Sequence, residues 1–199
     1  FFLSPTQTQK MSKLFKKGGQ NYKKFRPTYP DQLYAKIFNY AGVESRKFGV
    51  DLGCGTGQAT KVLAKHYERV LGVDPSLSQI ENAFQAPNIE YKEGMADKIP
   101  TESSTADIIT IAQTMHWLNQ ESVYKEVNRV LVPGGTLAIW GYPRCILKNS
   151  KSADELFAKY HFETMKPWWD ERRWLLDDYY KHVQLENDFI QVEKHIISD

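Results

Sequence analysis

FGVDLGCGTGQAT, residues 48–60, places three glycines within five positions directly after a short apolar run. The glycines are Gly53, Gly55 and Gly57. One interpretation is a tight turn from a strand into a helix, because glycine adopts positive φ angles without steric cost. The other is a ligand site, because a backbone without Cβ atoms lets a small molecule lie against the main chain and the first N–H groups of the next helix.

Strand patterns alternate with helix patterns on both sides of this loop. We expect helix 30–42, strand 48–52, helix 56–67, strand 70–74, helix 75–85, strand 89–92, strand 107–113, helix 121–131 and strand 136–142. A Pro-Gly-Gly run at 133–135 is expected to separate the last helix from its strand, and a sixth strand is expected at 188–198. The alternation predicts an α/β fold with a doubly wound, mostly parallel sheet and right-handed crossovers.

The composition indicates an ordinary globular chain. Its 199 residues fit one domain, and 41% hydrophobic with 25% charged residues argue against disorder throughout. No stretch approaches the roughly 18 apolar residues of a membrane span, and the opening FFLSP lacks the regions of a signal peptide. Cys54 and Cys145 make no disulfide framework, and neither has metal-ligand spacing with the histidines. We therefore expect a cytoplasmic protein with no metal and no membrane span.

Basic charge is concentrated near the N-terminus. Residues 10–26 carry seven Lys and Arg side chains and no acid, which leaves 19 bases against 24 acids elsewhere. A nucleic-acid patch or nuclear signal is one interpretation, and a solvated flexible lead-in is the commoner one. We expect residues 1–20 to be a flexible lead-in, residues 21–199 to form a single domain, and nucleic acid not to be a partner. Met11 resembles a natural start, so residues 1–10 are expected to be extraneous.

A carboxylate at the end of the second predicted strand favours the ligand interpretation of the glycines. Asp74 follows Gly53 by 21 positions. In nucleoside-binding α/β folds, an acid about 20 positions beyond the glycines binds the ribose hydroxyls. The spacing Gly53-x-Gly55-x-Gly57 departs from the dinucleotide fingerprint G-x-G-x-x-G, so a nicotinamide cofactor is disfavoured. The alternative for Asp74 is a cap on the helix that follows it.

These motifs resemble a known enzyme family. Two stretches, VDLGCGTG (50–57) and GVD (72–74), are similar to motifs I and II of the class I S-adenosylmethionine-dependent methyltransferases. Three later stretches resemble the later motifs of the small-molecule branch of that family: KIP (98–100), ADIITIAQTMHW (106–117) and VLVPGGTLAIWGY (130–142). NYKKFRPTYP (21–30) and MHW resemble the trans-aconitate methyltransferase-like subgroup. The resemblance covers about residues 20–145. It implies a Rossmann-like fold, S-adenosyl-L-methionine as cofactor and a small-molecule methyl acceptor.

The resemblance also implies which residues hold the cofactor. The backbone of Gly53, Gly55 and Gly57 would lie along it. Asp51 would meet the methionine ammonium, often through water, and Asp74 would hold the ribose.

Further cofactor contacts are implied by the later motifs and by the lead-in. The loop that contains Met95 and Ala96 would flank the adenine. Many relatives carry an acid at the position of Met95, so this chain can offer only packing there. Gln113 would line the methionine half, and Tyr22 and Arg26 resemble part of a segment that closes over the cofactor.

The acceptor side is expected near the end of the fourth strand. Because a sulfonium is already an activated electrophile, the protein must mainly align a nucleophile and exclude water, and a general base is optional. His116 is the catalytic candidate, either as an anchor for an anion or as a proton acceptor. Trp117 is the candidate to contact the sulfonium through cation–π attraction. Arg144 is a candidate carboxylate clamp. The alternative for each is a packing residue or a solvated loop residue.

A helical, aromatic-rich insert is predicted at 153–183, interrupted at Pro167. One interpretation is a lid in which Trp168, Trp169 and Trp174 cover an elongated or lipid-like acceptor. The other is a two-helix unit that buries its own aromatic side chains on the edge of the sheet.

The sheet of the family, as the resemblance implies it, has order 3-2-1-4-5-7-6 with an antiparallel seventh strand. Six strands are predicted here, so we expect the final antiparallel strand to be absent and the chain to be truncated at its C-terminus. The main functional hypothesis is methyl transfer to a small molecule by in-line SN2 displacement, with a carboxylic acid as the candidate acceptor. Its principal rival is a catalytically silent module that binds the cofactor or a partner. Methylation of RNA or protein is supported only by the basic lead-in.

Overall fold

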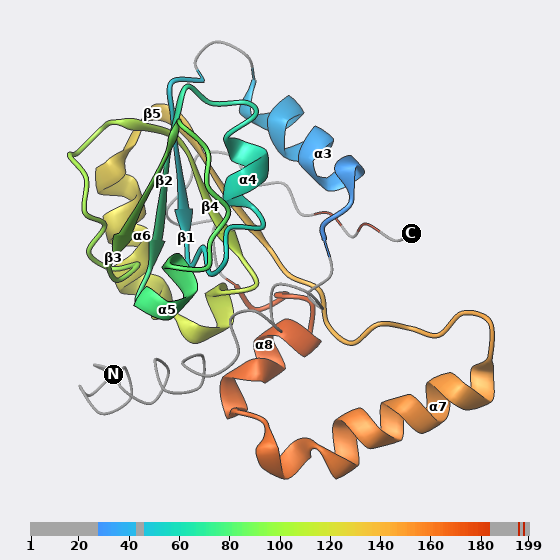
Figure 1. Cartoon of the computed structure of the whole chain (residues 1–199). Coiled ribbons are helices and arrows are strands. Elements are labelled where there is room, and N and C mark those ends of the chain that lie inside the picture. The colour runs from blue at the N-terminus through green and yellow to red at the C-terminus, as the bar shows by residue number, and fades with distance from the viewer. Residues whose placement is uncertain (1–27, 43–45, 184–194, 196, 198–199) are drawn as a thin grey trace.

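A five-stranded sheet forms the centre of the computed structural model, which describes residues 28–42, 46–183, 195 and 197 (Figure 1). The strand order is β3-β2-β1-β4-β5, and every described pairing is parallel. The strands are β1 Phe48–Leu52, β2 Arg69–Asp74, β3 Ile89–Glu93, β4 Ala106–Ala112 and β5 Leu131–Trp140. The predicted parallel α/β fold is confirmed, and the bounds of the first four strands agree within one residue.

Helices cover both faces of the sheet, with α3 and α4 on one face and α6 on the other (Figure 1). One apolar cluster joins Phe38 of α3 to Ile108 of β4. The second joins Val127 of α6 to Val50 of β1 and Ile109 of β4. The helices are α3 Asp31–Ala41, α4 Thr60–Leu63, α5 Leu77–Ile80 and α6 Gln120–Val130, with a 3₁₀ turn, η1, at Met115–Trp117.

The central strand β1 is buried along its whole length, and its side chains alternate between the two faces. Val50 and Leu52 join the cluster under α6, whereas Asp51 contacts Thr60 at the start of α4. The helix after β1 lies on one face and the helix after β4 on the other. The space between these neighbouring strands is therefore the topological switch point, where open α/β sheets bind ligands beyond the carboxyl ends of their strands.

The helices that follow β1 and β2 are shorter than predicted. The expected helix 56–67 is regular only in α4, and the expected helix 75–85 only in α5. Gly57 has a φ angle of +84°, which a right-handed helix cannot contain, so α4 begins after it. After α5, the side chain of Asn82 donates to the carbonyl of Ser78 and competes with the helical backbone for that acceptor.

The fifth strand begins earlier than predicted. The Pro-Gly-Gly run that was expected to precede the strand lies inside it. Ala106 of β4 pairs with Leu131, whereas Ile108 pairs with Thr136, so the intervening residues of β5 form a bulge. Gly134 has a φ angle of +79° and supplies the bend. The sequence signal for a break was real, but a bulge accommodates it without ending the strand.

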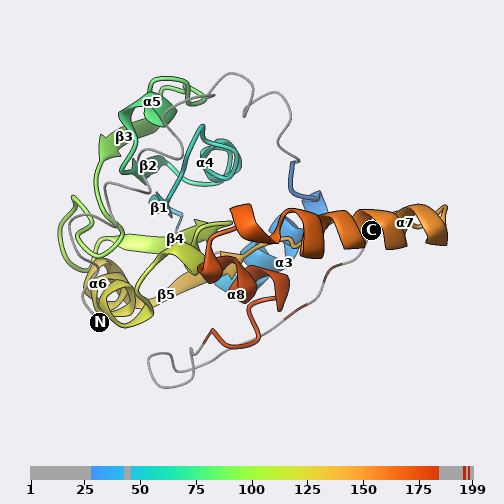
Figure 2. The ribbon, with the colours of Figure 1, turned by 90° about the horizontal axis from the view of Figure 1, so that it is seen from below.

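The predicted insert follows β5 as a series of short helices. It consists of α7 Lys151–Lys159, a π-helical turn at Tyr160–Thr164, 3₁₀ turns η3 Lys166–Trp168 and η4 Glu171–Arg173, and α8 Trp174–Asp177. Figure 1 shows α8 beneath the carboxyl ends of the strands, whereas α7 extends away from the sheet. Figure 2, seen from below, shows the same arrangement.

The two ends of the insert differ in how they are packed. Leu156, Phe162 and Trp168 are exposed, and Trp168 is 80% exposed. By contrast, Leu176 is buried, and Val183 belongs to the apolar cluster under α6. The insert therefore does not bury its own aromatic side chains as a self-contained two-helix unit. Only its C-terminal part packs against the sheet.

Some predictions fall on residues outside the described ranges. These are the lead-in at 1–20, the residues Tyr22 and Arg26, and nearly all of the strand expected at 188–198. They stay predictions, as do the single domain at 21–199 and the absence of a final antiparallel strand.

Candidate active site

The ends of β1, β2 and β4 are tied together at the switch point. The N–H of Gly53, directly after β1, donates to the carbonyl of Val73 in β2 (2.8 Å). Thr114, which follows β4, donates its hydroxyl to the carbonyl of Gly53 (3.4 Å). The glycine loop is therefore fixed on both sides at the switch point.

The three glycines of this loop have positive φ angles, but their missing side chains face different surroundings. A Cβ on Gly53 would overlap the side chain of Thr114, and a Cβ on Gly57 would lie 2.5 Å from the hydroxyl of Tyr91. Within residues 28–42 and 46–183, a Cβ on Gly55 would meet one atom within 4 Å, at 3.9 Å. Packing and the turn thus account for two of the glycines, whereas Gly55 faces open space against which a ligand can lie.

Asp51 lies beneath the glycine loop and is only 1% exposed. Thr60 donates its hydroxyl to one carboxylate oxygen (2.6 Å), and Thr110 of β4 donates to the other (2.8 Å). Burial nevertheless raises the pKa of Asp51 to about 6, because the two hydroxyl hydrogen bonds offset only part of the lost hydration. The site thus contains a buried carboxylate that a nearby cation would stabilise in its ionised form.

Asp74, the last residue of β2, connects the glycine loop to the segment that opens α5. One carboxylate oxygen accepts from the N–H of Gly55 (2.9 Å), and the other accepts from the N–H of Ser76 (2.9 Å). Burial raises the pKa of Asp74, although both backbone hydrogen bonds act in the opposite direction. Ser76 is itself the N-cap of α5, which has no side-chain cap bond, so Asp74 holds the segment before the helix and does not cap it. The bond to Gly55 places the same carboxylate beside the open face of the loop.

Two further segments with predicted site residues or their neighbours follow the carboxyl ends of β2 and β3. Met95 is half-buried and Ala96 is buried in the turn after β3. Met95 has no hydrogen-bonding oxygen, as the sequence indicates. Gln79 of α5 is 4% exposed, and its Oε1 lies 3.9 Å from the place that a Cβ on Gly55 would occupy.

Gln113 follows β4 and is buried with a φ angle of +56°, which is uncommon for a residue with a side chain. Its Nε2 donates to the carbonyl of Tyr142 (3.0 Å), and its N–H donates to the carbonyl of Trp140 (2.8 Å). These bonds tie the ends of β4 and β5 together. Backbone strain of this kind concentrates at functional sites.

His116 and Trp117 in η1 are in contact with the C-terminal part of the insert. His116 is 4% exposed, and its Nδ1 lies 2.8 Å from the hydroxyl of Tyr180. The guanidinium of Arg172 lies 5.1 Å from the ring centre of Trp117. One face of that ring therefore already contacts a cation supplied by the chain.

Arg144 is held in an ion pair. Both terminal nitrogens of its guanidinium donate to the carboxylate of Asp154 at the start of α7, the second at 3.1 Å. The N–H of Leu147 donates to the same carboxylate (2.9 Å). An acceptor carboxylate would have to displace Asp154 to use this side chain.

Comparison with known proteins identifies the family. Residues 50–139 match the family model described as "Methyltransferase domain". A Dictyostelium discoideum protein named "Putative methyltransferase" is 38% identical over 196 residues, which cover 98% of this chain and 73% of that protein. The chain belongs to the class I S-adenosylmethionine-dependent methyltransferases.

Other relatives agree with this assignment. A "Probable S-adenosylmethionine-dependent methyltransferase" of Saccharomyces cerevisiae is 29% identical over 148 residues, which cover 70% of this chain and 50% of that protein. The solved structure of a "Putative Type II Methyltransferase" from Anaeromyxobacter dehalogenans is 28% identical and has a TM-score of 0.69, covering 81% of this chain and 67% of that one. This methyltransferase therefore spans about half the length of its yeast relative.

The residues at the switch point of the methyltransferase are chemically suited to S-adenosylmethionine, its methyl donor. Gly55 leaves open the space that a Cβ would fill. Asp74 lies beside that space, bonded to the N–H of Gly55, and a carboxylate is a suitable acceptor for a ribose diol. Asp51 is a buried acid whose ionised form a sulfonium or ammonium would favour. The individual contacts of these residues with the cofactor stay predictions.

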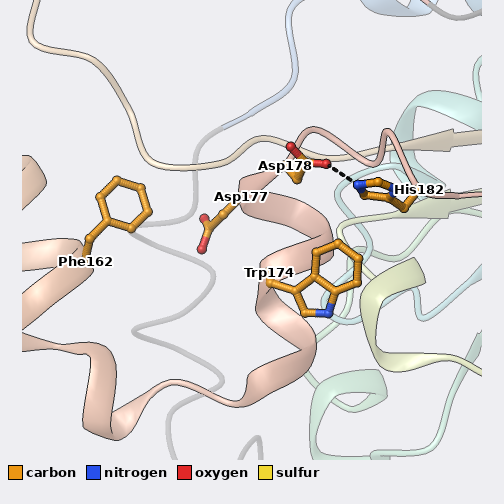
Figure 3. A pocket seen from close by; sticks show the side chains of 5 residues that line it. All are labelled: Phe162, Trp174, Asp177, Asp178 and His182. Atoms are coloured by element: carbon orange, nitrogen blue, oxygen red, sulfur yellow. Dashed lines mark ion pairs between the residues drawn. The ribbon is translucent and has the colours of Figure 1, made fainter.

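The insert of the methyltransferase also has a hollow of about 490 Å³, lined by Phe162, Trp174, Asp177, Asp178 and His182 (Figure 3). Its charged groups are largely compensated within the insert. Asp178 pairs with His182 (3.1 Å) and Lys181 (3.2 Å), and Arg173 lies 3.5 Å from Asp177. Among the described residues, each of its two acids therefore has a basic partner within the insert.

The sequence predicts no membrane span and no metal, and the described residues of the methyltransferase bear on both expectations. No helix there is long and apolar enough to cross a membrane. No group of three His, Cys, Asp or Glu side chains there is placed to hold a metal ion.

Sequence reasoning did not identify three residues that contact the predicted site residues. Thr110, which bonds Asp51, was detectable as a hydroxyl within the apolar run of β4. Gln79 had no signal, because its place near Gly55 depends on how α5 packs. Tyr180 lies 64 positions from His116, and no local pattern predicts their contact.

Proposed function

We propose that this chain transfers the methyl group of S-adenosylmethionine to a small-molecule acceptor by in-line displacement. The observation that carries the proposal is the cover that the insert forms over the loop after β4. An added Cβ on Gly141 would lie 2.5 Å from Leu176 and 2.8 Å from Tyr180, so the insert packs directly on the end of β5. Arg172 covers Trp117 from the same side. A covered site favours a small acceptor over a polymer.

The residues at the switch point, Asp51, Gly55 and Asp74, have positioning roles in this proposal. S-adenosylmethionine supplies a methyl group already activated by the sulfonium. Asp74 and the open face of Gly55 hold and orient the nucleoside, and Asp51 balances positive charge from below the loop. Orientation alone can supply roughly 7–11 kcal/mol of the barrier reduction. The covering insert excludes water, which would otherwise compete with the acceptor.

His116 is the proposed contact of the chain with the acceptor. Its burial and its bond to Tyr180 hold the ring in one orientation. From that position it anchors an anion when protonated, or accepts a proton from a hydroxyl when neutral. An ionised carboxylate needs only the anchor, because it is already a nucleophile at neutral pH.

A carboxylic acid is our preferred acceptor class, which agrees with the resemblance to the trans-aconitate methyltransferase-like subgroup. Arg144 is the second candidate anchor, but Asp154 occupies its guanidinium. In the proposal, His116 therefore binds the acid first, and Arg144 contributes only if α7 moves. The exposed Trp168 would contact an elongated acceptor only after a similar movement.

Transfer of radiolabelled methyl groups tests this function. Purified chain is incubated with labelled S-adenosylmethionine and panels of small carboxylic acids, fatty acids and RNA. The proposal predicts labelled methyl esters from one or more small acids, and H116A is expected to reduce their formation without loss of S-adenosylhomocysteine binding. Labelling of RNA alone would contradict it. Tight cofactor binding with no transfer to any panel would instead support the silent binding module.

A further inference from the structure

Gln79 is a buried polar residue whose side-chain oxygen has no hydrogen-bond donor among the described residues. The side chain is 4% exposed. Within the described part of the chain, its Oε1 accepts no hydrogen bond although the atom is buried. Leaving a buried acceptor unsatisfied destabilises the folded protein, because the atom loses its hydration and gains no hydrogen bond. Such a group in a native protein requires an explanation, and a missing ligand is one.

The position of this atom indicates which ligand is missing. Among the residues that the structure describes, the Oε1 of Gln79 is the one atom within 4 Å of the place that a Cβ on Gly55 would occupy, at 3.9 Å. The N–H of Gly55 in turn donates to the carboxylate of Asp74 (2.9 Å). Figure 1 shows α5, which carries Gln79, at the carboxyl end of β2, where Asp74 lies. An open backbone face, a carboxylate and an unsatisfied amide oxygen therefore border one space.

The hydrogen bonds that Asp74 already makes leave a role for a second acceptor. Each of its carboxylate oxygens accepts one backbone N–H, from Gly55 and from Ser76. The sequence-based expectation gives Asp74 both hydroxyls of the ribose. A carboxylate has about four lone-pair sites, of which these bonds use two. A diol presents two donors, so a second acceptor beside Asp74 can share them.

We propose that the Oε1 of Gln79 accepts a hydrogen bond from one ribose hydroxyl of the cofactor, while Asp74 accepts from the other. This inference rests on S-adenosylmethionine being the cofactor and is independent of the proposed acceptor. It makes Gln79 a cofactor-binding residue that is strained in the free protein and satisfied in the complex. Binding and stability therefore respond in opposite directions when the amide is removed.

The variant Q79M tests this opposition, because methionine keeps the length of the side chain and its helix propensity but removes the acceptor. We expect the affinity for S-adenosylhomocysteine, measured by isothermal titration calorimetry, to fall about 2- to 12-fold, as for one net hydrogen bond. The melting temperature of the free protein is expected to rise by about 2–4 °C, because a buried unsatisfied group is gone. Q85M is the matched control, since Gln85 is exposed and should change neither quantity.

Analogues of S-adenosylhomocysteine that lack the 2′- or the 3′-hydroxyl identify the bonded group. Q79M should bind one analogue as well as the wild type does, and should lose affinity for the other. A Q79M variant that is less stable but binds S-adenosylhomocysteine as tightly as the wild type would overturn the inference, as would equal losses for both analogues. Wild-type protein that binds the cofactor but transfers no methyl group would contradict only the proposed function.

Discussion

The Nδ1 atom of His116 and the hydroxyl of Tyr180 lie 2.8 Å apart and connect the loop after β4 to the end of the insert. Tyr180 has a φ angle of +55°, and its neighbour Tyr179 has one of +57°. Two consecutive residues with side chains rarely adopt this left-handed conformation, which is energetically unfavourable. The packing that maintains it also fixes where the Tyr180 hydroxyl lies. The insert thus contributes directly to the orientation of the predicted catalytic residue.

The first prediction concerns this contact. Y180F should lower kcat/KM for the acceptor about 2- to 12-fold, because one hydrogen bond that orients His116 is lost. The affinity for S-adenosylhomocysteine should not change, since Asp74 and Gly55 lie on other strand ends. Steady-state kinetics and calorimetry measure the two quantities. Y179F is the matched control, because Tyr179 is exposed. Equal activity of Y180F and wild type would exclude a positioning role for Tyr180.

The second prediction concerns the packing of the insert on β5. G141A would place a Cβ 2.5 Å from Leu176 and 2.8 Å from Tyr180, so the C-terminal part of the insert must shift. We expect trypsin to cleave faster at Arg172 and Arg173, and KM for the acceptor to rise. Cleavage at Lys61, an exposed residue of α4 outside the insert, is the control and should not accelerate. If trypsin cleaves G141A and the wild type at the same rate within the insert, the insert is not held by this contact.

A third prediction separates the roles of two glycines. G55A should leave the free protein folded, with the cost of about 1–2 kcal/mol that a left-handed residue carries. It should weaken S-adenosylhomocysteine binding by more than about tenfold, because its methyl group would occupy space left open for the cofactor.

G57A provides the contrast, because its Cβ would lie 2.5 Å from the hydroxyl of Tyr91. Its loss of stability should exceed that of G55A. Thermal unfolding and calorimetry distinguish the two effects. A G55A variant that binds the cofactor normally would show that the open face of Gly55 is not the ligand surface.

The fold was predictable from sequence because it depends on local patterns. The apolar run 48–52, the glycines after it and the carboxylate at Asp74 are close in sequence, and each pattern has one structural solution in a parallel sheet. The wrong start predicted for the fifth strand also came from a local pattern. A Pro-Gly-Gly run indicates a break, but only pairing with β4 shows that the break is a bulge within a longer strand.

The candidate site was less predictable because its contacts depend on tertiary packing. Sequence identifies Arg144 as a possible carboxylate clamp, but not that Asp154 already binds it. It identifies His116, but not its bond to Tyr180. It also gives no reason to select Gln79, whose distinguishing property is an unsatisfied atom. Charge compensation, burial and long-range hydrogen bonds are properties of the folded chain.

Asp51 provides a prediction about pH. Burial raises its pKa from 3.8 to about 6 in the free protein. Because the folded protein holds the proton of Asp51 more tightly than the unfolded chain does, protonation of Asp51 favours the folded state. This contribution to the free energy of unfolding is complete below the pKa of the unfolded chain and is lost as the pH rises through the pKa of the folded protein. Cofactor binding has the opposite dependence. The ammonium of S-adenosylhomocysteine favours ionised Asp51, so the complex must release any proton that the free site holds.

We therefore expect the affinity for S-adenosylhomocysteine to rise by up to about tenfold per pH unit below pH 6 and to level off above it. Calorimetry between pH 5 and 8, in buffers of different ionisation enthalpy, measures both the affinity and the released proton. D51N should abolish the dependence that Asp51 causes, because the amide can still bond Thr60 and Thr110 but does not titrate. Burial also raises the pKa of Asp74, so a slope that persists unchanged in D51N would assign the titration to Asp74 or another group and remove Asp51 from the cation site.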